Sequence, residues 1–327
     1  MNEISAALRA EHIRVWFPVR NALGHVVNHV KAVDDVSLSL LPGKTYGLVG
    51  ESGCGKSTLG RALCHLVPTT EGSVSLMGKE IAPLSDRDML PYRRTIQMVF
   101  QDPYTSLDPR QRVGRMLMEV QKIHHIGSSS DERMARAMDI LSQVGLLKEH
   151  FYRYPHEFSG GQRQRIGLAR ALILDPRVMI CDEPVSALDV SIQSQVINLL
   201  RDLQAARLLS YLFISHDMSV IKYISDRVGV MYLGHLVEEA DVDTLFANPI
   251  HPYTKTLMSA VPSIDPRQST ERIVLKGELP SPIDPPGGCV FHTRCPFAGK
   301  ECQVHVPALQ EVTPGHFAAC PRMADRH

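Results

Sequence analysis

The sequence predicts an α/β fold built around a mostly parallel β-sheet. Short apolar segments alternate with segments of helical composition over most of the chain, as in a parallel sheet with helices on both faces. Two apolar segments end in chemically distinctive residues. Residues 46–49 run into Gly-Glu-Ser-Gly-Cys-Gly-Lys-Ser at 50–57, and residues 178–181 run into Asp182 and Glu183. Both positions are where an α/β sheet places its functional groups.

Length and composition set the limits of the interpretation. The 327 residues suffice for one large domain and an appendage. Lys+Arg and Asp+Glu both number 35, so nothing electrostatic indicates a nucleic-acid partner. No apolar run approaches the ~18–20 residues of a membrane span, and the N-terminus lacks an export signal pattern. We therefore expect an intracellular protein that works at a membrane only through a partner.

The N-terminal third should supply several strands. Residues 1–10 resemble a frayed leader, and residues 12–17 alternate as a strand should. Residues 18–30 look irregular, whereas Val33, Val36, Leu38 and Leu40 indicate a second strand. Residues 46–49 predict a buried strand, 58–63 a helix, and 73–77 and 95–100 two further strands.

Residues 102–176 differ in character from their surroundings, and we interpret them as a helical insertion. Helices are expected at 131–144 and 162–174, then a strand at 178–181, a helix at 192–206 and a strand at 211–214. Residues 228–232 and 235–239 predict a terminal hairpin. From about 262 prolines become frequent (Pro262, Pro266, Pro280, Pro282, Pro285 and Pro286), which indicates a linker and a small loop-rich module.

The segment 50–57 fits G-x-x-x-x-G-K-[S/T], the phosphate-binding P-loop. Glycines let several backbone N–H groups point at one phosphate chain, and the helix N-terminus adds partial positive charge. Lys56 can reach the β- and γ-phosphates, and the Ser57 hydroxyl can bind Mg²⁺. The predicted ATP-binding residues here are Gly50, Ser52, Gly53, Cys54, Gly55, Lys56, Ser57 and Thr58.

Further features narrow the chemistry. Asp182 should hold Mg²⁺, and Glu183 is placed to polarise an attacking water. Residues 159–162 precede a helix and offer a second phosphate nest. Gln101 and His216 each follow a predicted strand. Taken alone, Gln101 would be interpreted as a surface residue and His216 as a core residue. Their positions in the chain relative to the P-loop and to the acidic pair at 182–183 favour a role in the site instead.

In these motifs the chain resembles an ABC transporter ATPase subunit over roughly residues 12–250. Ser159, Gly160, Gly161 and Gln162 resemble the family's signature motif, although Phe158 stands where the family usually has Leu. Gln101 resembles the Q-loop, residues 186–189 the D-loop, and His216 the switch histidine. The resemblance implies a RecA-like P-loop core with an antiparallel β subdomain and a helical subdomain. Cys181 stands where the family prefers an aliphatic residue, a small apolar replacement.

In this family two subunits sandwich two ATP molecules head to tail. The resemblance therefore implies that residues 159–162 complete the partner's site, and that Glu183, His216 and Gln101 serve hydrolysis. Ser57, Gln101 and Asp182 would hold Mg²⁺. Phe17 resembles the aromatic residue that stacks on adenine in the family. The less favoured alternative is that Phe17 or Trp16 is simply part of the core.

Three segments narrow the resemblance to ATPase subunits of dipeptide and oligopeptide importers, of the second of their two types: residues 101–110, 248–254 and 288–296. The implied partners are a second, homologous ATPase, two transmembrane permease subunits and an extracytoplasmic solute-binding protein, with no nucleic acid. The chain would sit peripherally on the cytoplasmic face of the membrane. We expect a nucleotide-binding domain over 1–261, its helical subdomain at about 102–176, and a C-terminal module over 262–327.

Other functions stay open at this point. An importer for nickel chelates or sugars would carry the same motifs. A soluble ABC ATPase of translation or DNA repair usually has two nucleotide domains or a long coiled coil, and neither is apparent here. A redox or metal sensor acting through the tail is a third alternative.

Four of the seven cysteines crowd into the last 39 residues: Cys289, Cys295, Cys302 and Cys320. Five, six and seventeen residues separate them, and a proline follows Cys295, so we expect one [4Fe–4S] cluster. Zinc is the alternative, although its sites favour closer cysteine pairs. Disulfides are the least expected in a reducing compartment.

Overall fold

The computed structural model describes residues 5–102, 106–260, 273, 275 and 277–320. It divides into two compact units. The P-loop unit comprises Arg9–Ser39, Thr45–Ser75 and Phe213–His327, and the helical unit comprises Met1–Leu8, Leu40–Lys44 and Leu76–Leu212. The predicted features at Pro103, Tyr104, Thr105, Pro262 and Pro266 lie outside the described residues. Among the residues described, no helix has the length and hydropathy of a membrane span.

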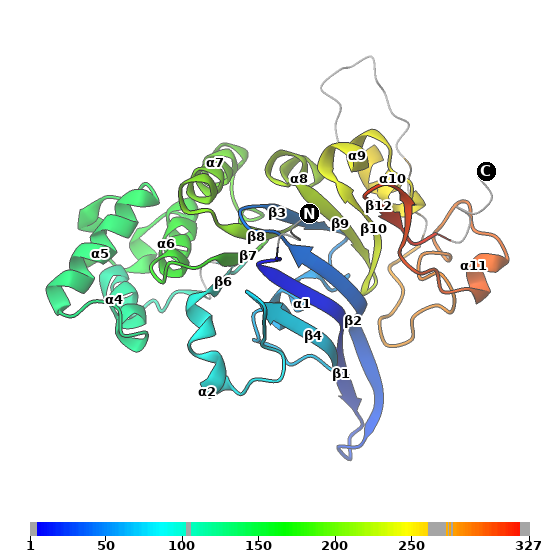
Figure 1. Cartoon of the computed structure of the whole chain (residues 1–327), viewed down its shortest axis with the longest axis horizontal. Helices are drawn as coiled ribbons and strands as arrows, with labels where there is room; N and C mark the ends of the chain where they lie inside the picture. Colours follow the sequence, from blue (N-terminus) through cyan, green and yellow to red (C-terminus); the bar gives the residue numbers. More distant parts are fainter. Residues whose placement is uncertain (1–4, 103–105, 261–272, 274, 276, 321–327) are drawn as a thin grey trace. The chain divides into compact units, whose positions relative to one another are not determined.

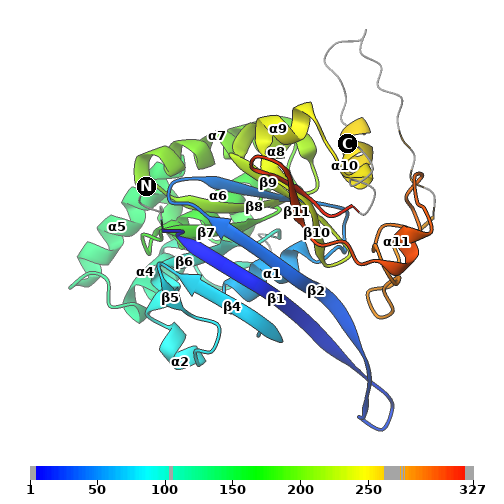
Figure 2. The same cartoon turned by 45° about the vertical axis from the view of Figure 1, so that its right-hand side comes forward.

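In the P-loop unit, strands β2 (Val26–Leu40), β1 (Leu8–Arg20) and β4 (Glu71–Leu76) lie side by side in that order, as Figure 2 shows. Two sequence predictions here are wrong. Residues 18–30 are not irregular, because β1 continues to Arg20 and β2 begins at Val26. Residues 1–10 are not merely a leader, because Leu8 and Ala10 are buried in β1. The exposed hairpin end carries no alternation of buried and exposed residues from which a strand could be predicted.

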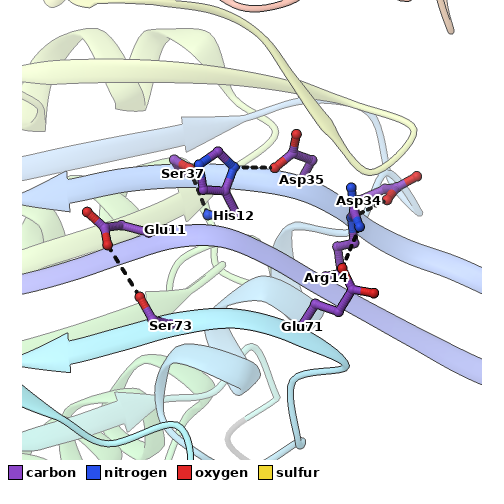
Figure 3. Close-up of polar contacts among 8 residues, drawn as sticks. All are labelled: Glu11, His12, Arg14, Asp34, Asp35, Ser37, Glu71 and Ser73. Carbon is purple, nitrogen blue, oxygen red and sulfur yellow. Dashed lines mark hydrogen bonds and ion pairs between the residues drawn. The ribbon is translucent and has the colours of Figure 1, made fainter.

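A break in the alternation of β1 and β2 explains their unusual apolar spacing. His12 and Asp35 both have left-handed backbones, with φ of 51° and 63°. His12 Nδ1 lies 2.7 Å from Asp35 Oδ1, and the His12 N–H donates to Ser37 Oγ at 2.9 Å (Figure 3). Each strand has two successive non-buried residues at this point. The break therefore puts Val33 and Val36, three residues apart, on the same face.

Arg14 joins the three strands. Its guanidinium lies 3.2 Å from Asp34 of β2 and also pairs with Glu71 of β4 (Figure 3). Glu11 and Ser73 make a second link between β1 and β4 at 3.4 Å. Such exposed pairs each contribute only ~0.2–1 kcal/mol. They help to fix the register of the strands, while the buried side chains supply most of the stability.

A second sheet of the P-loop unit contains, in order, β11 (Gln310–Thr313), β12 (His316–Ala318), β10 (His235–Asp241), β9 (Arg227–Tyr232) and β3 (Thr45–Val49). β3 and β9 are parallel, and the other neighbours are antiparallel. The β9–β10 hairpin is confirmed, but it is not terminal, because β12 pairs with β10. The cysteine-rich tail thus adds strands to a sheet that earlier residues begin.

Five helices accompany the described strands of this unit: α1 (Lys56–Leu63), α8 (Met218–Ile224), α9 (Val242–Ala247), α10 (Pro252–Ser259) and α11 (Glu301–Val304) (Figure 1). The β3 residues are buried throughout, as expected of a parallel strand covered on both faces.

The helical unit contains the parallel pair β6 (Ile96–Val99) and β7 (Val178–Asp182), with Val99 opposite Cys181. Strand β8 (Ser210–Ser215) begins in this unit and ends in the P-loop unit. The other described elements are β5 (Lys79–Glu80), α2 (Asp86–Met89), α4 (Val113–Ile123), α5 (Ser130–Gln143), α6 (Gly160–Leu172) and α7 (Val190–Arg207), with 3₁₀ turns at Tyr92–Arg94, Lys148–Tyr152 and Pro155–Glu157.

Helices α4, α5 and α6 pack on one another (Figure 1). The helices predicted at 131–144, 162–174 and 192–206 match α5, α6 and α7 within two residues at each end. Parallel strands with flanking helices confirm the predicted α/β class. The domain boundaries at 102–176 and 261/262 stay predictions.

Candidate functional site

The P-loop connects β3 to α1, and its glycines are sterically required. A Cβ on Gly55 would lie 2.0 Å from the carbonyl oxygen of Ala32, and the φ of Gly55 is 104°. A Cβ on Gly50 would lie 2.1 Å from the carbonyl oxygen of Met231. Only glycine allows the backbone to approach its neighbours this closely. The loop therefore has the tight curvature that a phosphate nest needs.

Lys56 opens helix α1 and is almost fully buried. Its ammonium donates to the carbonyl oxygens of Gly50 at 2.7 Å and Glu51 at 2.9 Å. Cys54 Sγ lies 3.6 Å from the same nitrogen. Burial raises the pKa of the Cys54 thiol, although the Lys56 charge opposes this. Cys54 is therefore a neutral packing residue within the loop.

Glu51 is held by residues far along the chain. Its N–H donates to the Tyr253 hydroxyl at 2.8 Å, and its carboxylate pairs with Arg294 at 2.8 Å. The segments around Tyr253 and Arg294 contribute only to the family resemblance in the sequence, and no role was predicted for either residue. Both segments are rich in polar and aromatic residues, yet neither belongs to a nucleotide-binding motif. That combination was the available sign that they have a role of their own.

In the helical unit the two acids and the glutamine stand at adjacent strand ends. Asp182 is the last residue of β7 and is 1% exposed. Gln101 follows β6, and its amide donates to Glu183 Oε2 at 2.8 Å. Because β6 and β7 are parallel, their carboxyl ends meet at one edge. The structure thus brings Gln101 and Glu183 together.

The backbone at Glu183 is unusual. Its φ is 45°, a left-handed value that is uncommon for residues other than glycine. The Ser186 hydroxyl donates to the Glu183 carbonyl at 3.1 Å and supports this turn. Strained backbone of this kind concentrates at functional sites. Next to it, Cys181 is fully buried, and burial raises its pKa to about 12, so it behaves as a small apolar residue.

The signature residues form the start of α6. Ser159 is the N-cap: its hydroxyl accepts from the Gln162 N–H at 3.4 Å, while Gln162 Oε1 accepts from the Ser159 N–H at 3.0 Å. This is a capping box. A Cβ on Gly161 would lie 2.4 Å from Ile192 Cγ2 of α7. Phe158 is buried and packs edge-on against His150 at 5.1 Å between ring centroids, so the larger side chain is accommodated.

Phe17 and His216 belong to the P-loop unit. Phe17 alternates with the buried Ile13 and Val15 on one face of β1 and is 40% exposed. Trp16 lies on the other face, where the Lys31 ammonium is 5.1 Å from its ring centroid. His216 is exposed and follows β8. The predicted site residues therefore fall into two groups, each described within its own unit.

The four C-terminal cysteines are all described, and none of them is in a disulfide. Cys289 and Cys302 are buried, and Cys295 and Cys320 are partly buried. Burial raises the pKa of Cys289 to about 11, and the charges of Cys320, Cys302 and Cys295 add to this effect. The described residues contain no group of three or more His, Cys, Asp or Glu side chains gathered as metal ligands.

Comparison with known proteins gives two family matches. The family described as "ABC transporter" matches residues 33–186. The family described as "Oligopeptide/dipeptide transporter, C-terminal region" matches residues 237–302. The chain is 53% identical over 317 residues to the oligopeptide transport ATP-binding protein AppF of Bacillus subtilis, covering 96% of each chain. It is 54% identical over 283 residues to OppF of Escherichia coli, covering 86% of this chain and 85% of OppF.

Solved structures agree on the fold. The dimeric ATP-binding cassette MJ0796, bound to ADP and Pi after hydrolysis, superposes with a TM-score of 0.64 at 24% identity, over 72% of this chain and 98% of that chain. The ATP-binding cassette MJ1267 in its ADP conformation gives 0.62 at 25% identity, over 75% and 96%. The chain therefore belongs to the ABC transporter ATPases, among the ATP-binding proteins that carry the oligopeptide/dipeptide transporter C-terminal region.

Proposed function

We propose that this chain hydrolyses ATP to power the import of peptides through partner permease subunits. The observation that carries the proposal is the similarity to peptide transport proteins over almost the whole chain, including 96% of AppF. The matched C-terminal region supports it, because that region is named for oligopeptide and dipeptide transporters. Both observations favour peptides over nickel chelates or sugars, and transport over a soluble role in translation or DNA repair.

For nucleotide binding we propose that the P-loop backbone and Lys56 hold the phosphates and that Phe17 stacks on adenine. The close backbone approach at Gly50 and Gly55 fits a phosphate cradle. The exposed face of Phe17, on the apolar side of β1, fits a flat aromatic base. The oxygen atoms of Ser57, Gln101 and Asp182 are the hard ligands that Mg²⁺ prefers. When bound, Mg²⁺ neutralises phosphate charge.

For hydrolysis we propose that Glu183 is the general base and that Gln101 and His216 assist it. The Gln101 amide donates to the Glu183 carboxylate at 2.8 Å and helps to orient it. A positioned carboxylate can accept the proton of an attacking water. Phosphoryl transfer depends mainly on such positioning and on charge stabilisation. The left-handed backbone at Glu183 supports this assignment.

We propose that Ser159, Gly160, Gly161 and Gln162 act on nucleotide bound to a second, homologous ATPase, in a heterodimer. The first N–H groups of α6 offer positive partial charge. The remaining partners would be two transmembrane permease subunits and an extracytoplasmic solute-binding protein, with this chain on the cytoplasmic face of the membrane. Residues 1–261 would form the nucleotide-binding domain, with a helical subdomain at about 102–176, and 262–327 the C-terminal module.

For the tail we propose one [4Fe–4S] cluster held by Cys289, Cys295, Cys302 and Cys320, with structural zinc as the alternative. Four cysteine thiols outside disulfides are the kind of donor set that such a cluster requires. Protein purified without oxygen should absorb near about 400 nm and contain about four irons per chain. Cys302→Ser should lose the iron, whereas Cys64→Ser should keep it. Colourless protein with one zinc per chain would establish the alternative.

The test of the main proposal is ATP hydrolysis by the assembled transporter. The chain would be co-purified with its permease subunits and reconstituted in vesicles with the solute-binding protein. Peptides should stimulate hydrolysis several-fold, whereas nickel chelates and sugars should not. Stimulation by one of those other solutes, with peptides inert, would overturn the assignment to peptides.

A further inference from the structure

We infer that Arg294 and Tyr253 are positioning residues for the P-loop, so that nucleotide affinity depends on the C-terminal region of the chain. Both hold Glu51, the second residue of the loop. All three residues belong to the P-loop unit. The inference depends on the proposed role of the P-loop as the nucleotide site, and it adds a mechanism by which distant residues set its geometry.

Glu51 is fixed at two separate points. The Tyr253 hydroxyl accepts a hydrogen bond from its main-chain N–H at 2.8 Å. Arg294 Nη1 lies 2.8 Å from its carboxylate, and the Arg294 side chain is only 9% exposed. A charge-assisted bond in such a shielded place is stronger than a surface pair. One contact holds the backbone and the other the side chain, so the residue cannot pivot.

Constraint at Glu51 reaches Lys56 through the loop itself. The carbonyl oxygen of Glu51 accepts a hydrogen bond from Lys56 Nζ at 2.9 Å and another from the Cys54 N–H at 3.3 Å. A shift of Glu51 therefore moves two contacts that determine the shape of the loop and the place of its ammonium group. Nucleotide affinity should change as a result, because the proposed phosphate nest depends on that shape.

The residues that hold Glu51 are themselves held by aromatic packing. The Tyr253 ring packs against Tyr232 at 4.7 Å and Phe291 at 5.3 Å between centroids. The Arg294 guanidinium lies 6.0 Å from the centre of the Tyr232 ring. Tyr232 and Phe291 also touch each other, at 5.1 Å. These contacts connect β9, α10 and the cysteine-containing segment behind the P-loop.

A buried polar network fixes the start of α10, where Tyr253 lies. His251 Nδ1 accepts from the Tyr253 N–H at 3.1 Å. The N–H groups of Ile250 and His251 donate to the Glu238 carboxylate at 2.7 and 2.8 Å, and His316 lies 2.7 Å from that carboxylate. Glu238, His251 and His316 are each 1% exposed or less. Satisfied buried networks of this kind hold their members rigidly.

The experiment measures equilibrium ATP affinity of the full chain with a fluorescent ATP analogue, alongside its thermal midpoint. Arg294→Gln and Glu51→Gln should each weaken binding about threefold to tenfold, the scale of one charge-assisted hydrogen bond lost indirectly. The double variant Glu51→Gln/Arg294→Gln should bind no more weakly than either single variant, because both remove one interaction. Arg294→Lys should recover part of the affinity, since it restores the charge without the planar fork.

Arg227→Gln is the matched control. Arg227 makes a comparable partly buried ion pair with Glu239, at 2.5 Å, and belongs to the same unit. In the parallel pairing of β3 and β9, Arg227 lies opposite Tyr46, near the beginning of β3. The P-loop follows Val49, at the other end of that strand. Its loss should lower the thermal midpoint without weakening nucleotide binding.

Tyr253→Phe tests the second contact, and it should weaken binding while keeping the aromatic packing. Arg294→Gln protein that is folded and binds the analogue with wild-type affinity would overturn the inference, as would fully additive effects of the Arg294 and Glu51 changes on affinity. Lys56→Ala separates this failure from failure of the proposed function. If Lys56→Ala also binds normally, the P-loop is not the nucleotide site. If only Lys56→Ala loses binding, the site stands and the positioning role does not.

Discussion

The P-loop and the strand ends after β6 and β7 achieve fixed geometry in different ways. At the strand ends, Gln101 and Glu183 hydrogen bond directly, and the strands that carry them are neighbours. In the P-loop, Glu51 is held by Tyr253 and Arg294, which come from the C-terminal part of the chain. One arrangement is local to a strand pair, and the other needs the tail to be folded.

This difference suggests that substitutions at the strand ends and substitutions affecting the P-loop have different functional effects. Changes at the strand ends should act on the chemical step and leave nucleotide binding intact. Changes that reach the P-loop, directly or through the tail, should act on binding. The predictions below test that division.

The largest effects are expected from Glu183→Gln and Lys56→Ala. The first should lower turnover, and the second should lower ATP affinity. Glu183→Gln removes the proposed base, so turnover in the assembled transporter should fall by ~10² or more while ATP still binds. Lys56→Ala removes the ammonium proposed to bind phosphate, so ATP affinity itself should fall. Hydrolysis rates and equilibrium binding would be measured for both variants. Near wild-type turnover by Glu183→Gln would contradict its role.

The next effect concerns sharing of sites between subunits. If Ser159 acts on nucleotide bound to a partner, a Ser159→Arg chain should still bind ATP with its own P-loop. Transporters would be assembled with this change in one ATPase subunit and the lysine change in the other. If the sites are shared, both changes fall in the same composite site, so the other site stays intact and part of the activity remains. If each subunit instead used its own signature residues, the two changes would disable both sites. Full ATPase activity from an isolated monomer would contradict the shared-site arrangement.

A smaller effect is expected for Gln101→Ala. Loss of the 2.8 Å bond frees the Glu183 carboxylate without removing it. Turnover should fall about tenfold, the equivalent of one hydrogen bond of ~1.4 kcal/mol. Gln101→Glu places a second carboxylate beside Glu183 and should lower turnover further through repulsion. If Gln101→Ala matched Glu183→Gln in severity, the proposed Mg²⁺ contact of Gln101 would matter more than its hydrogen bond to Glu183.

The last prediction concerns stability in place of activity: a dependence of the free energy of unfolding on pH that arises at His251. Burial lowers the pKa of His251 to about 3, against 6.5 for an ordinary histidine. Between these values the unfolded chain binds a proton that the folded chain excludes. The free energy of unfolding should therefore decrease as pH falls from about 6.5, and the loss at pH 5 should be about 2 kcal/mol from this site.

His251→Asn isolates this contribution, because asparagine can still accept the helix-capping hydrogen bond but does not titrate. Urea unfolding at pH 7 and pH 5 should show a smaller difference in the variant by about 2 kcal/mol. His25→Asn, at the exposed end of the β1–β2 hairpin, serves as the control. An unchanged pH dependence in His251→Asn would show that other groups dominate acid sensitivity.

The fold was largely predictable because several of its strands are continuous apolar runs. Residues 45–49, 178–182 and 210–215 are buried throughout, so composition alone marks them. The β1–β2 hairpin was not predictable beyond residue 17, because Leu23, Val26 and Val27 are apolar yet exposed. The pairing of β12 with β10 also escaped prediction, since a three-residue strand leaves no periodic pattern.

The candidate site divides in the same way. Gly50, Lys56, Asp182 and Glu183 belong to short motifs whose residue types follow from phosphate and metal chemistry. Tyr253 and Arg294 lie 202 and 243 positions from Glu51 in the chain. No local rule connects residues so far apart, because their contact depends on how the whole unit packs. For the same reason, the spacing of the four cysteines in the sequence suggested a metal site but could not determine whether their thiols lie close together in the folded chain.

The most direct test of the central claim is peptide uptake by cells or vesicles containing the assembled transporter, with wild-type chain or Glu183→Gln. We predict that labelled peptide accumulates with the wild-type chain and fails to accumulate with Glu183→Gln, although the variant assembles and binds ATP. Undiminished peptide uptake with Glu183→Gln would contradict the account.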